Sequence, residues 1–217
     1  MLISLYLSYV FIAIALLTSL TVYLRPTSII YLKIFPLFLI IIAILGSIIG
    51  YLSWHNKSNT ILYNFFTTLE FVFYFFVLKE VILNRQIKKI IFFVLLIYPI
   101  ITFLNIFLIQ KMTVFNSVTY SIGCLLIVTF SISYFFELFQ LVDSINLLLQ
   151  PAFWICSGLL FYFSCTFPLF GLANFIKSPP KIIWNNLAII SNLLDVLLYS
   201  SFTIAFLCRI KIKRSTL

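Results

Sequence analysis

Residues 61–83 read ILYNFFTTLEFVFYFFVLKEVIL, and this stretch decides the fold class. A helix rises about 1.5 Å per residue, so a helix of this length crosses a hydrocarbon layer of about 30 Å. Six further apolar stretches of similar length occur in the chain, separated by short polar breaks that are typical of turns. We therefore predict an all-α fold, a polytopic membrane helix bundle with seven transmembrane helices. The predicted spans are residues 3–24, 29–53, 61–83, 90–110, 115–136, 151–175 and 182–208.

The composition also indicates that lipid is the main solvent. Of the 217 residues, 64% are hydrophobic and 9% are charged, and the mean hydropathy is +1.20. Five acidic and fourteen basic side chains are too few to cover a water-soluble protein of this length. The net charge of +9 does not indicate nucleic-acid binding, because the basic residues lie in short clusters between apolar runs. We expect residues 1–217 to form a single transmembrane domain whose main partner is the lipid bilayer.

The positions of the basic residues predict the orientation. Cytoplasmic loops keep an excess of Lys and Arg, which places the N-terminus outside, the C-terminus in the cytoplasm and the protein in the cell (inner) membrane. Ten basic residues then lie inside, namely Arg25, Lys33, Lys79, Arg85, Lys88, Lys89, Arg209, Lys211, Lys213 and Arg214. Four lie outside, namely Lys57, Lys111, Lys177 and Lys181. Trp54, Trp154 and Trp184 each fall at the end of a predicted span, as expected of indoles at the membrane interface.

The connection between the fifth and sixth spans has an unusual pattern. In residues 136–150, FELFQLVDSINLLLQ, polar residues recur at roughly helical spacing among apolar ones: Glu137, Gln140, Asp143, Ser144 and Gln150. One interpretation is a helix that continues past the headgroups. The other is a cytoplasmic docking face for a basic segment of a partner protein, because the segment carries two acids and no Lys or Arg.

Two acids, Glu70 and Asp195, lie deep inside predicted spans. An ionisable group at membrane depth costs about 2.5 to 3.5 kcal/mol on insertion scales, so such groups usually face the bundle interior. Helical spacing places Tyr63, Thr67 and Tyr74 on the stripe of Glu70, and Asn192, Tyr199 and Thr203 on the stripe of Asp195. A third polar stripe, formed by Tyr98, Thr102 and Asn105, is predicted in the fourth span.

The sequence offers these acids no ionic partner. No Lys, Arg or His lies at matching depth in any predicted span, so we expect both carboxyls to be protonated at rest. A protonated carboxyl can donate a hydrogen bond to Asn105, Tyr98 or a backbone carbonyl on another helix. The candidate polar site therefore has two interpretations, a hydrogen-bonded core that fixes helix packing and a site for a proton, a cation or a polar ligand.

Other motifs carry less information. We predict no catalytic residues, no metal site and no cofactor, because the single histidine, His55, lies in a loop and the four cysteines lie apart in apolar runs. Gly46 and Gly50 have the GxxxG spacing that allows close helix packing. Pro36, Pro99 and Pro168 lie within spans and are expected to kink them.

Three stretches together carry a family resemblance: FFTTLEFVFYFF (residues 65–76), FWICSGLLFYFS (153–164) and NLLDVLLYSSFTIAFLC (192–208). They resemble a group of small bacterial seven-helix membrane proteins of unassigned function, which are similar to the membrane sensor regions that precede some histidine kinases. The resemblance implies an association with signalling. Since the sequence contains no kinase domain, it also implies that a separate chain supplies the output.

Three functions are compatible with these features. The favoured one is a non-enzymatic sensory or accessory module, which binds a small or lipidic ligand and acts with a separate signalling or membrane protein. The second is a small transporter or proton-coupled carrier in which Glu70 and Asp195 change protonation. The third is a membrane-embedded lipid-modifying enzyme that uses the two acids. A water-accessible cavity reaching both acids favours the second, and the third requires the acids to share one substrate.

Overall fold

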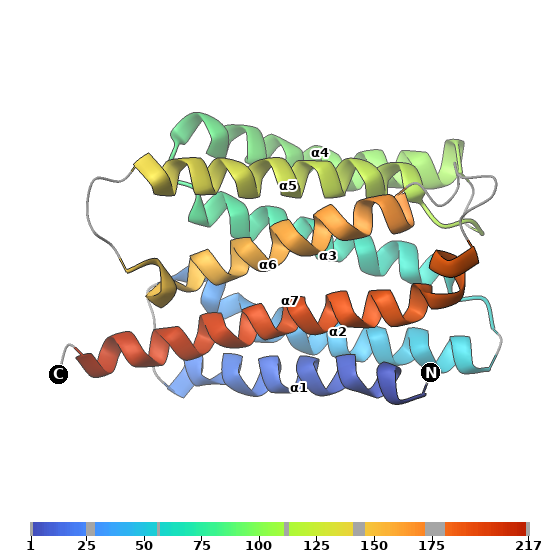
Figure 1. Ribbon diagram of the computed structural model, residues 1–217. Coiled ribbons are helices and arrows are strands. Elements are labelled where there is room, and N and C mark those ends of the chain that lie inside the picture. Colours follow the sequence, from blue (N-terminus) through green and yellow to red (C-terminus); the bar gives the residue numbers. More distant parts are fainter. Residues whose placement is uncertain are drawn as a thin grey trace.

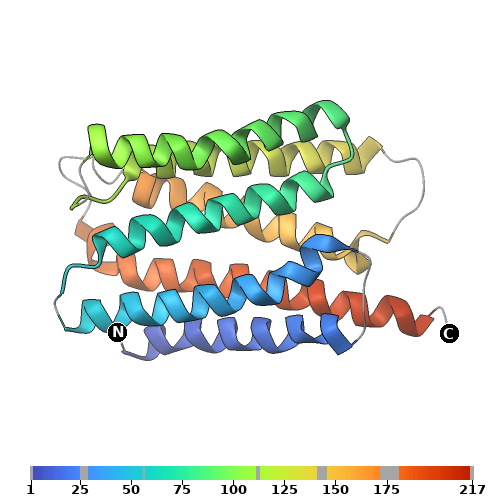
Figure 2. The same cartoon turned by 180° about the vertical axis from the view of Figure 1, so that it is seen from behind.

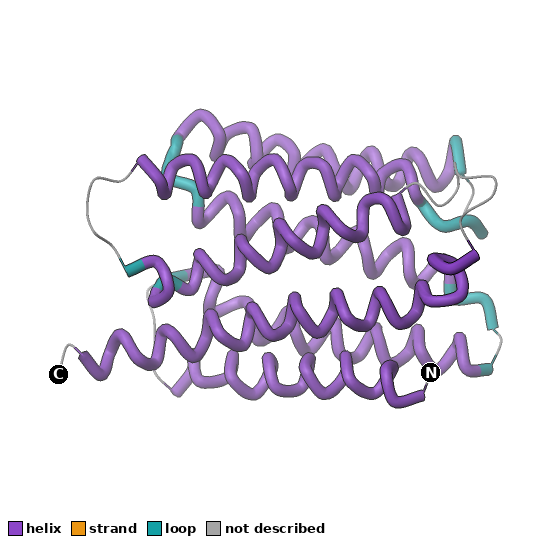
Figure 3. Tube along the Cα trace, in the orientation of Figure 1, coloured by secondary structure: helices purple, strands orange, loops and turns teal. Residues whose placement is uncertain are grey.

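The computed structural model describes residues 2–24, 29–55, 57–110, 113–140, 146–171 and 181–215. Seven described helices are long and apolar enough to cross a membrane, which confirms the predicted all-α, seven-helix fold (Figure 3). The helices are α1 (Leu2–Leu24), α2 (Ile30–Trp54), α3 (Thr60–Val81), α4 (Arg85–Leu108), α5 (Ser117–Gln140), α6 (Pro151–Thr166) and α7 (Lys181–Ser215). A 3-10 turn, η1 (Leu147–Leu149), precedes α6, and a π-helical segment, η2 (Phe167–Gly171), extends it.

The helices run roughly alongside one another in a bundle whose two termini lie at opposite ends (Figure 1). Helix α1 packs against α2 and α7, and α7 continues the contact with α6. Helix α3 contacts α2, α4 and α5. The view from behind shows α3 between the α1–α2 pair and the α4–α5 pair (Figure 2). Which end of the bundle faces the cytoplasm stays a prediction.

Three helix boundaries differ from the prediction. Residues 84–89, NRQIKK, were predicted to connect two spans, but residues 85–89 begin α4. The helix starts here because the Asn84 side chain accepts hydrogen bonds from the backbone amides of Gln86 and Ile87. Helix α5 continues to Gln140 and α7 continues to Ser215, both beyond the predicted spans. Predicted residues 172–175 of the sixth span lie outside the described residues.

The end of α5 is tied to the connection between α3 and α4. The carboxylate of Glu137 accepts hydrogen bonds from the backbone amides of Leu83 at 2.6 Å and Asn84 at 3.1 Å. Helix α5 therefore continues to Gln140, as the first interpretation of residues 136–150 expects, and the docking face stays a prediction. Asp143 and Ser144 lie outside the described residues, and Gln150 directly precedes α6.

The exterior of the bundle is apolar on every span. More than half of the surface of one large apolar side chain on each helix is exposed: Leu17, Leu37, Phe65, Phe93, Leu125, Phe161 and Leu193. Such a surface suits lipid rather than water, because soluble monomers rarely expose large contiguous apolar patches. Trp54 is exposed at the last residue of α2, and the Trp154 indole donates to the Leu148 carbonyl at the start of α6. The side chain of Trp184 lies outside the described residues.

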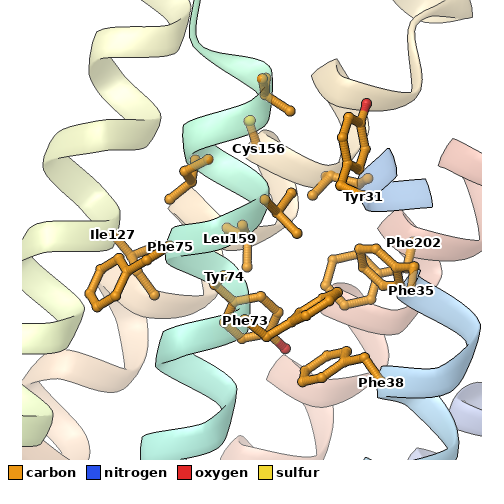
Figure 4. Close-up of a cluster of buried hydrophobic side chains, with 14 of the residues drawn as sticks. Tyr31, Phe35, Phe38, Phe73, Tyr74, Phe75, Ile127, Cys156, Leu159 and Phe202 are labelled. Atoms are coloured by element: carbon orange, nitrogen blue, oxygen red, sulfur yellow. The ribbon is translucent and has the colours of Figure 1, made fainter. Parts of the chain in front are cut away.

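An aromatic cluster fills the interior at the end of the bundle that holds the C-terminus. We call Phe35, Phe38, Phe73, Phe202 and Phe206 the aromatic layer. The ring of Phe35 makes edge-on contacts with Phe73, Phe202 and Phe206 at centroid distances of 4.9 to 5.4 Å. Phe38 stacks on Phe73, so that α2, α3 and α7 meet in one packed layer (Figure 4).

Gly123 marks a tight contact inside the bundle. A Cβ atom at Gly123 would lie 2.7 Å from a ring carbon of Phe71 and 2.8 Å from the Tyr98 hydroxyl. We expect Gly123→Ala to lower the free energy of unfolding by about 1 to 3 kcal/mol, because overpacking forces buried neighbours apart. Gly46→Ala is the matched control, since a Cβ there would meet nothing within 4 Å. Thermal unfolding in detergent measures both, and equal stability of the two variants would contradict the prediction.

Candidate functional site

A cavity of about 200 Å³ opens inside the bundle, in the half that lies nearer the N-terminus. Both deep acids, Glu70 and Asp195, line it. The remaining lining residues come from α1, α2, α3, α5, α6 and α7: Ser8, Tyr9, Ile12, Ile42, Gly46, Ile49, Tyr63, Phe66, Thr67, Tyr120, Tyr162, Phe163, Asn192 and Tyr199. At about 30 Å³ per molecule, this space would hold roughly six or seven waters.

Helical spacing explains why α3 and α7 supply the acids. Tyr63, Thr67 and Glu70 lie three and four residues apart and so occupy one face of α3. Asn192, Asp195 and Tyr199 have the same spacing on α7. Both faces point to the cavity, whereas the next turns of the same helices carry Phe73 and Phe202 of the aromatic layer. Packed aromatic rings therefore close the cavity on the side that faces the C-terminal end of the bundle.

The two carboxyls differ in their partners. The Asp195 carboxyl lies near the Tyr162 hydroxyl on α6. Glu70 has neither a hydrogen bond nor an ion pair from its carboxyl to any of the described residues. Both side chains keep part of their surface accessible, and that surface faces the cavity. An unpaired carboxyl in this position can bind a group that enters the cavity.

The first helix contributes polar groups at the cavity wall. The Tyr9 hydroxyl donates to the backbone carbonyl of Gly46 at 3.2 Å, and the Ser8 hydroxyl donates to the Asn192 side chain at 3.2 Å. The predicted close helix contact at the GxxxG motif does not form at Gly46, which borders the cavity. At Gly50, the space that a Cβ would occupy is taken by the Tyr9 hydroxyl, 2.7 Å away. Gly50 therefore accommodates the Tyr9 hydroxyl, and Gly46 borders the cavity instead of contacting the backbone of another helix.

Two buried tyrosines near the acids keep unused hydroxyls. Tyr199 lines the cavity and is 5% exposed, and its hydroxyl has no hydrogen-bond partner among the described residues. The Tyr74 hydroxyl, just beyond the cavity wall, is fully buried and also unpaired within the described part of the chain. A buried hydroxyl without a partner costs about 1 to 3 kcal/mol, a cost that Tyr74 carries beside the cavity.

The structure separates the predicted site residues into two groups. Tyr63, Thr67, Glu70, Asn192, Asp195 and Tyr199 line the cavity, and Tyr74 lies next to it. Tyr98 and Asn105 do not pair with the acids. Tyr98 donates to the Thr119 carbonyl of α5, and Asn105 donates to Gln110 and Asn116 at the turn between α4 and α5. Thr102 bonds to its own helix, so the stripe on α4 serves packing.

Four hydroxyl-bearing lining residues were not predicted from the sequence, namely Ser8, Tyr9, Tyr120 and Tyr162. Each carries a hydroxyl within a predominantly apolar span that holds no acid at membrane depth. They reach the cavity because α1 and α6 pack against α7 and α5 packs against α3. Helical periodicity does not predict which helices become neighbours.

The comparisons with known proteins give no relative. No protein-family model, no curated protein and no solved structure matches the chain. Among the described residues, no group of three or more His, Cys, Asp or Glu side chains is placed to hold a metal ion. Any account of the function therefore rests on the cavity.

Proposed function

We propose that this integral membrane protein is a sensory module that binds a small polar ligand in the cavity between Glu70 and Asp195 and signals through a separate partner protein. The observation that carries the proposal is a cavity lined by two carboxyls, one of which has no partner among the described residues. Concave sites with a few convergent polar groups are the usual form of ligand sites. An intramembrane acid is also functional more often than structural.

The route from the cavity to the opposite end of the bundle supports a sensory role. Glu70 precedes Phe71 and Phe73 on α3, and Phe73 packs in the aromatic layer with Phe35 and Phe202. A ligand that moves α3 against α7 therefore also moves the contact between α2 and α7. At the far end of α3, Glu137 of α5 holds the connection to α4, whose first turn carries Arg85, Lys88 and Lys89. This basic turn beside the end of α5 is the surface we assign to the partner.

A carrier is the second candidate, because both acids border one cavity. A carrier must also open a path on the other side of its site. The aromatic layer closes that side with buried rings from three helices. Transport would require these rings to separate, whereas sensing needs only a small displacement. We therefore favour the sensor.

A cavity-filling substitution tests the proposal. A Cβ added at Gly46 meets nothing within 4 Å and Gly46 lines the cavity, so Gly46→Leu should extend into the cavity while the protein still folds. We expect small polar metabolites that raise the Tm of the purified protein in lipid nanodiscs to have no effect on Gly46→Leu. The control is Ile44→Phe, which adds bulk on the lipid-facing side of the same helix, where Ile44 is 55% exposed. A ligand response that survives in Gly46→Leu would refute a ligand site in this cavity.

A further inference from the structure

We infer that the ligand of this cavity is a small organic cation, an amine or a quaternary ammonium compound, held between the two carboxyls and the surrounding tyrosine rings. This inference rests on the proposed function and specifies its ligand class. Three features of the cavity wall carry it, namely its charge, its aromatic rings and its unused polar groups.

The charge of the wall selects a cation. The lining includes two carboxyls, and none of the described lining residues is Lys, Arg or His. An anionic ligand would find no positive group in this wall, whereas a cation allows a carboxyl to ionise and to pair with it. A cation instead gives Glu70 the partner that it lacks among the described residues. Because the resting carboxyls are expected to be protonated, binding of the cation releases a proton from one of them to solvent.

The rings of the wall suit an organic rather than an inorganic cation. Five tyrosines and two phenylalanines line the cavity: Tyr9, Tyr63, Tyr120, Tyr162, Tyr199, Phe66 and Phe163. Aromatic faces attract ammonium groups through cation–π interactions, which strengthen when the cation is desolvated. Hard metal ions instead require about six oxygen ligands at fixed distances. Among the described residues, the two carboxyls of the wall have no third acid, histidine or cysteine beside them to build such a ligand set.

The unused polar groups fit an ammonium compound that carries a second polar function. The Tyr199 side chain lines the cavity one helical turn beyond Asp195, and its hydroxyl makes no hydrogen bond to a described residue. A ligand hydroxyl can donate to the Tyr199 hydroxyl or accept from it, and a ligand N–H can donate to it, while the ammonium contacts a carboxyl. The cavity volume of about 200 Å³ limits the ligand to a small molecule.

A set of charge-matched probes tests the ligand class. The purified protein in lipid nanodiscs is titrated with choline and isopentylamine, with their uncharged counterparts dimethylbutanol and isopentyl alcohol, and with the anion isovalerate. At about 100 times Kd, a bound probe should raise the Tm by about 5 °C or more. We expect this rise with at least one ammonium probe and a change below about 1 °C with the uncharged and anionic probes.

The variants separate failure of the ligand class from failure of the site. We expect Asp195→Asn to weaken ammonium binding about tenfold or more, and Gly46→Leu to abolish it. If the uncharged or anionic probes stabilise the wild type and not Gly46→Leu, the cavity binds ligands but the inferred class is wrong. If no probe of any charge shifts the Tm, both the class and the proposed function are contradicted.

Discussion

Replacing Glu70 by glutamine and Asp195 by asparagine should abolish the response of the protein to its ligand without reducing its stability. Each amide keeps the shape of the acid but removes its charge. A charge-assisted hydrogen bond contributes about 1.5 to 3 kcal/mol, so each single variant should lose about tenfold to 100-fold in affinity. The double variant should fail to complement a deletion strain at matched protein levels.

The stability of these variants distinguishes a ligand site from a packing core. Glu70 has no hydrogen bond or ion pair to a described residue, so Glu70→Gln breaks no contact. In Asp195→Asn the side-chain carbonyl keeps its place near the Tyr162 hydroxyl. We therefore expect the Tm to stay unchanged or to rise, as is common when a functional polar group is neutralised. A packing role would instead lower the stability by about 1 to 3 kcal/mol in each variant.

Glu80→Gln is the matched control for these variants. Glu80 lies on α3 like Glu70, but its carboxylate is 3.5 Å from the Lys79 ammonium and it is not among the residues that line the cavity. We expect full complementation by Glu80→Gln. Normal complementation by the Glu70→Gln, Asp195→Asn double variant would contradict the proposed role of the acids.

The sequence allowed the helices to be predicted because hydropathy reports burial in lipid directly. Each predicted span overlaps a described helix, and the largest error at a helix start is at α4. There the charged run after Asn84 indicated a loop, although asparagine is a good N-cap and a helix can begin outside the hydrocarbon. The extension of α7 to Ser215 was missed for the same reason, since hydropathy does not register a polar helix end.

The site could be predicted only in part, because periodicity gives the residues on one helix face but not the neighbouring helices. The stripes of Glu70 and Asp195 reach the same cavity. The stripe of Tyr98 and Asn105 was placed in the same polar core, yet α4 packs against α3 and α5 away from the cavity. Gly46 was interpreted as a helix contact, and a spacing pattern alone cannot distinguish a contact from a cavity.

Asn64→Ala should cause the largest loss of stability among the substitutions considered. The Asn64 side chain is 2% exposed and joins α3 to the connection between α4 and α5. Its amide nitrogen donates to the Val114 carbonyl at 3.0 Å, and its carbonyl oxygen accepts from the Asn116 backbone amide at 3.0 Å. The Asn116 side chain in turn accepts a hydrogen bond from Asn105. Asn64 therefore belongs to a hydrogen-bond network that connects α3 with the turn between α4 and α5.

In Asn64→Ala, the Val114 carbonyl and the Asn116 backbone amide both lose the side chain that forms their hydrogen bonds. At about 1 to 3 kcal/mol for each unsatisfied group, we expect the free energy of unfolding to fall by about 2 to 5 kcal/mol. Asn64→Asp keeps the acceptor for Asn116 but loses the donor to Val114, so it should lose less than alanine. Ser133→Ala is the control, because the Ser133 hydroxyl bonds to the Thr129 carbonyl of its own helix. If Asn64→Ala is no less stable than Ser133→Ala in denaturant titrations, the turn does not depend on the asparagine.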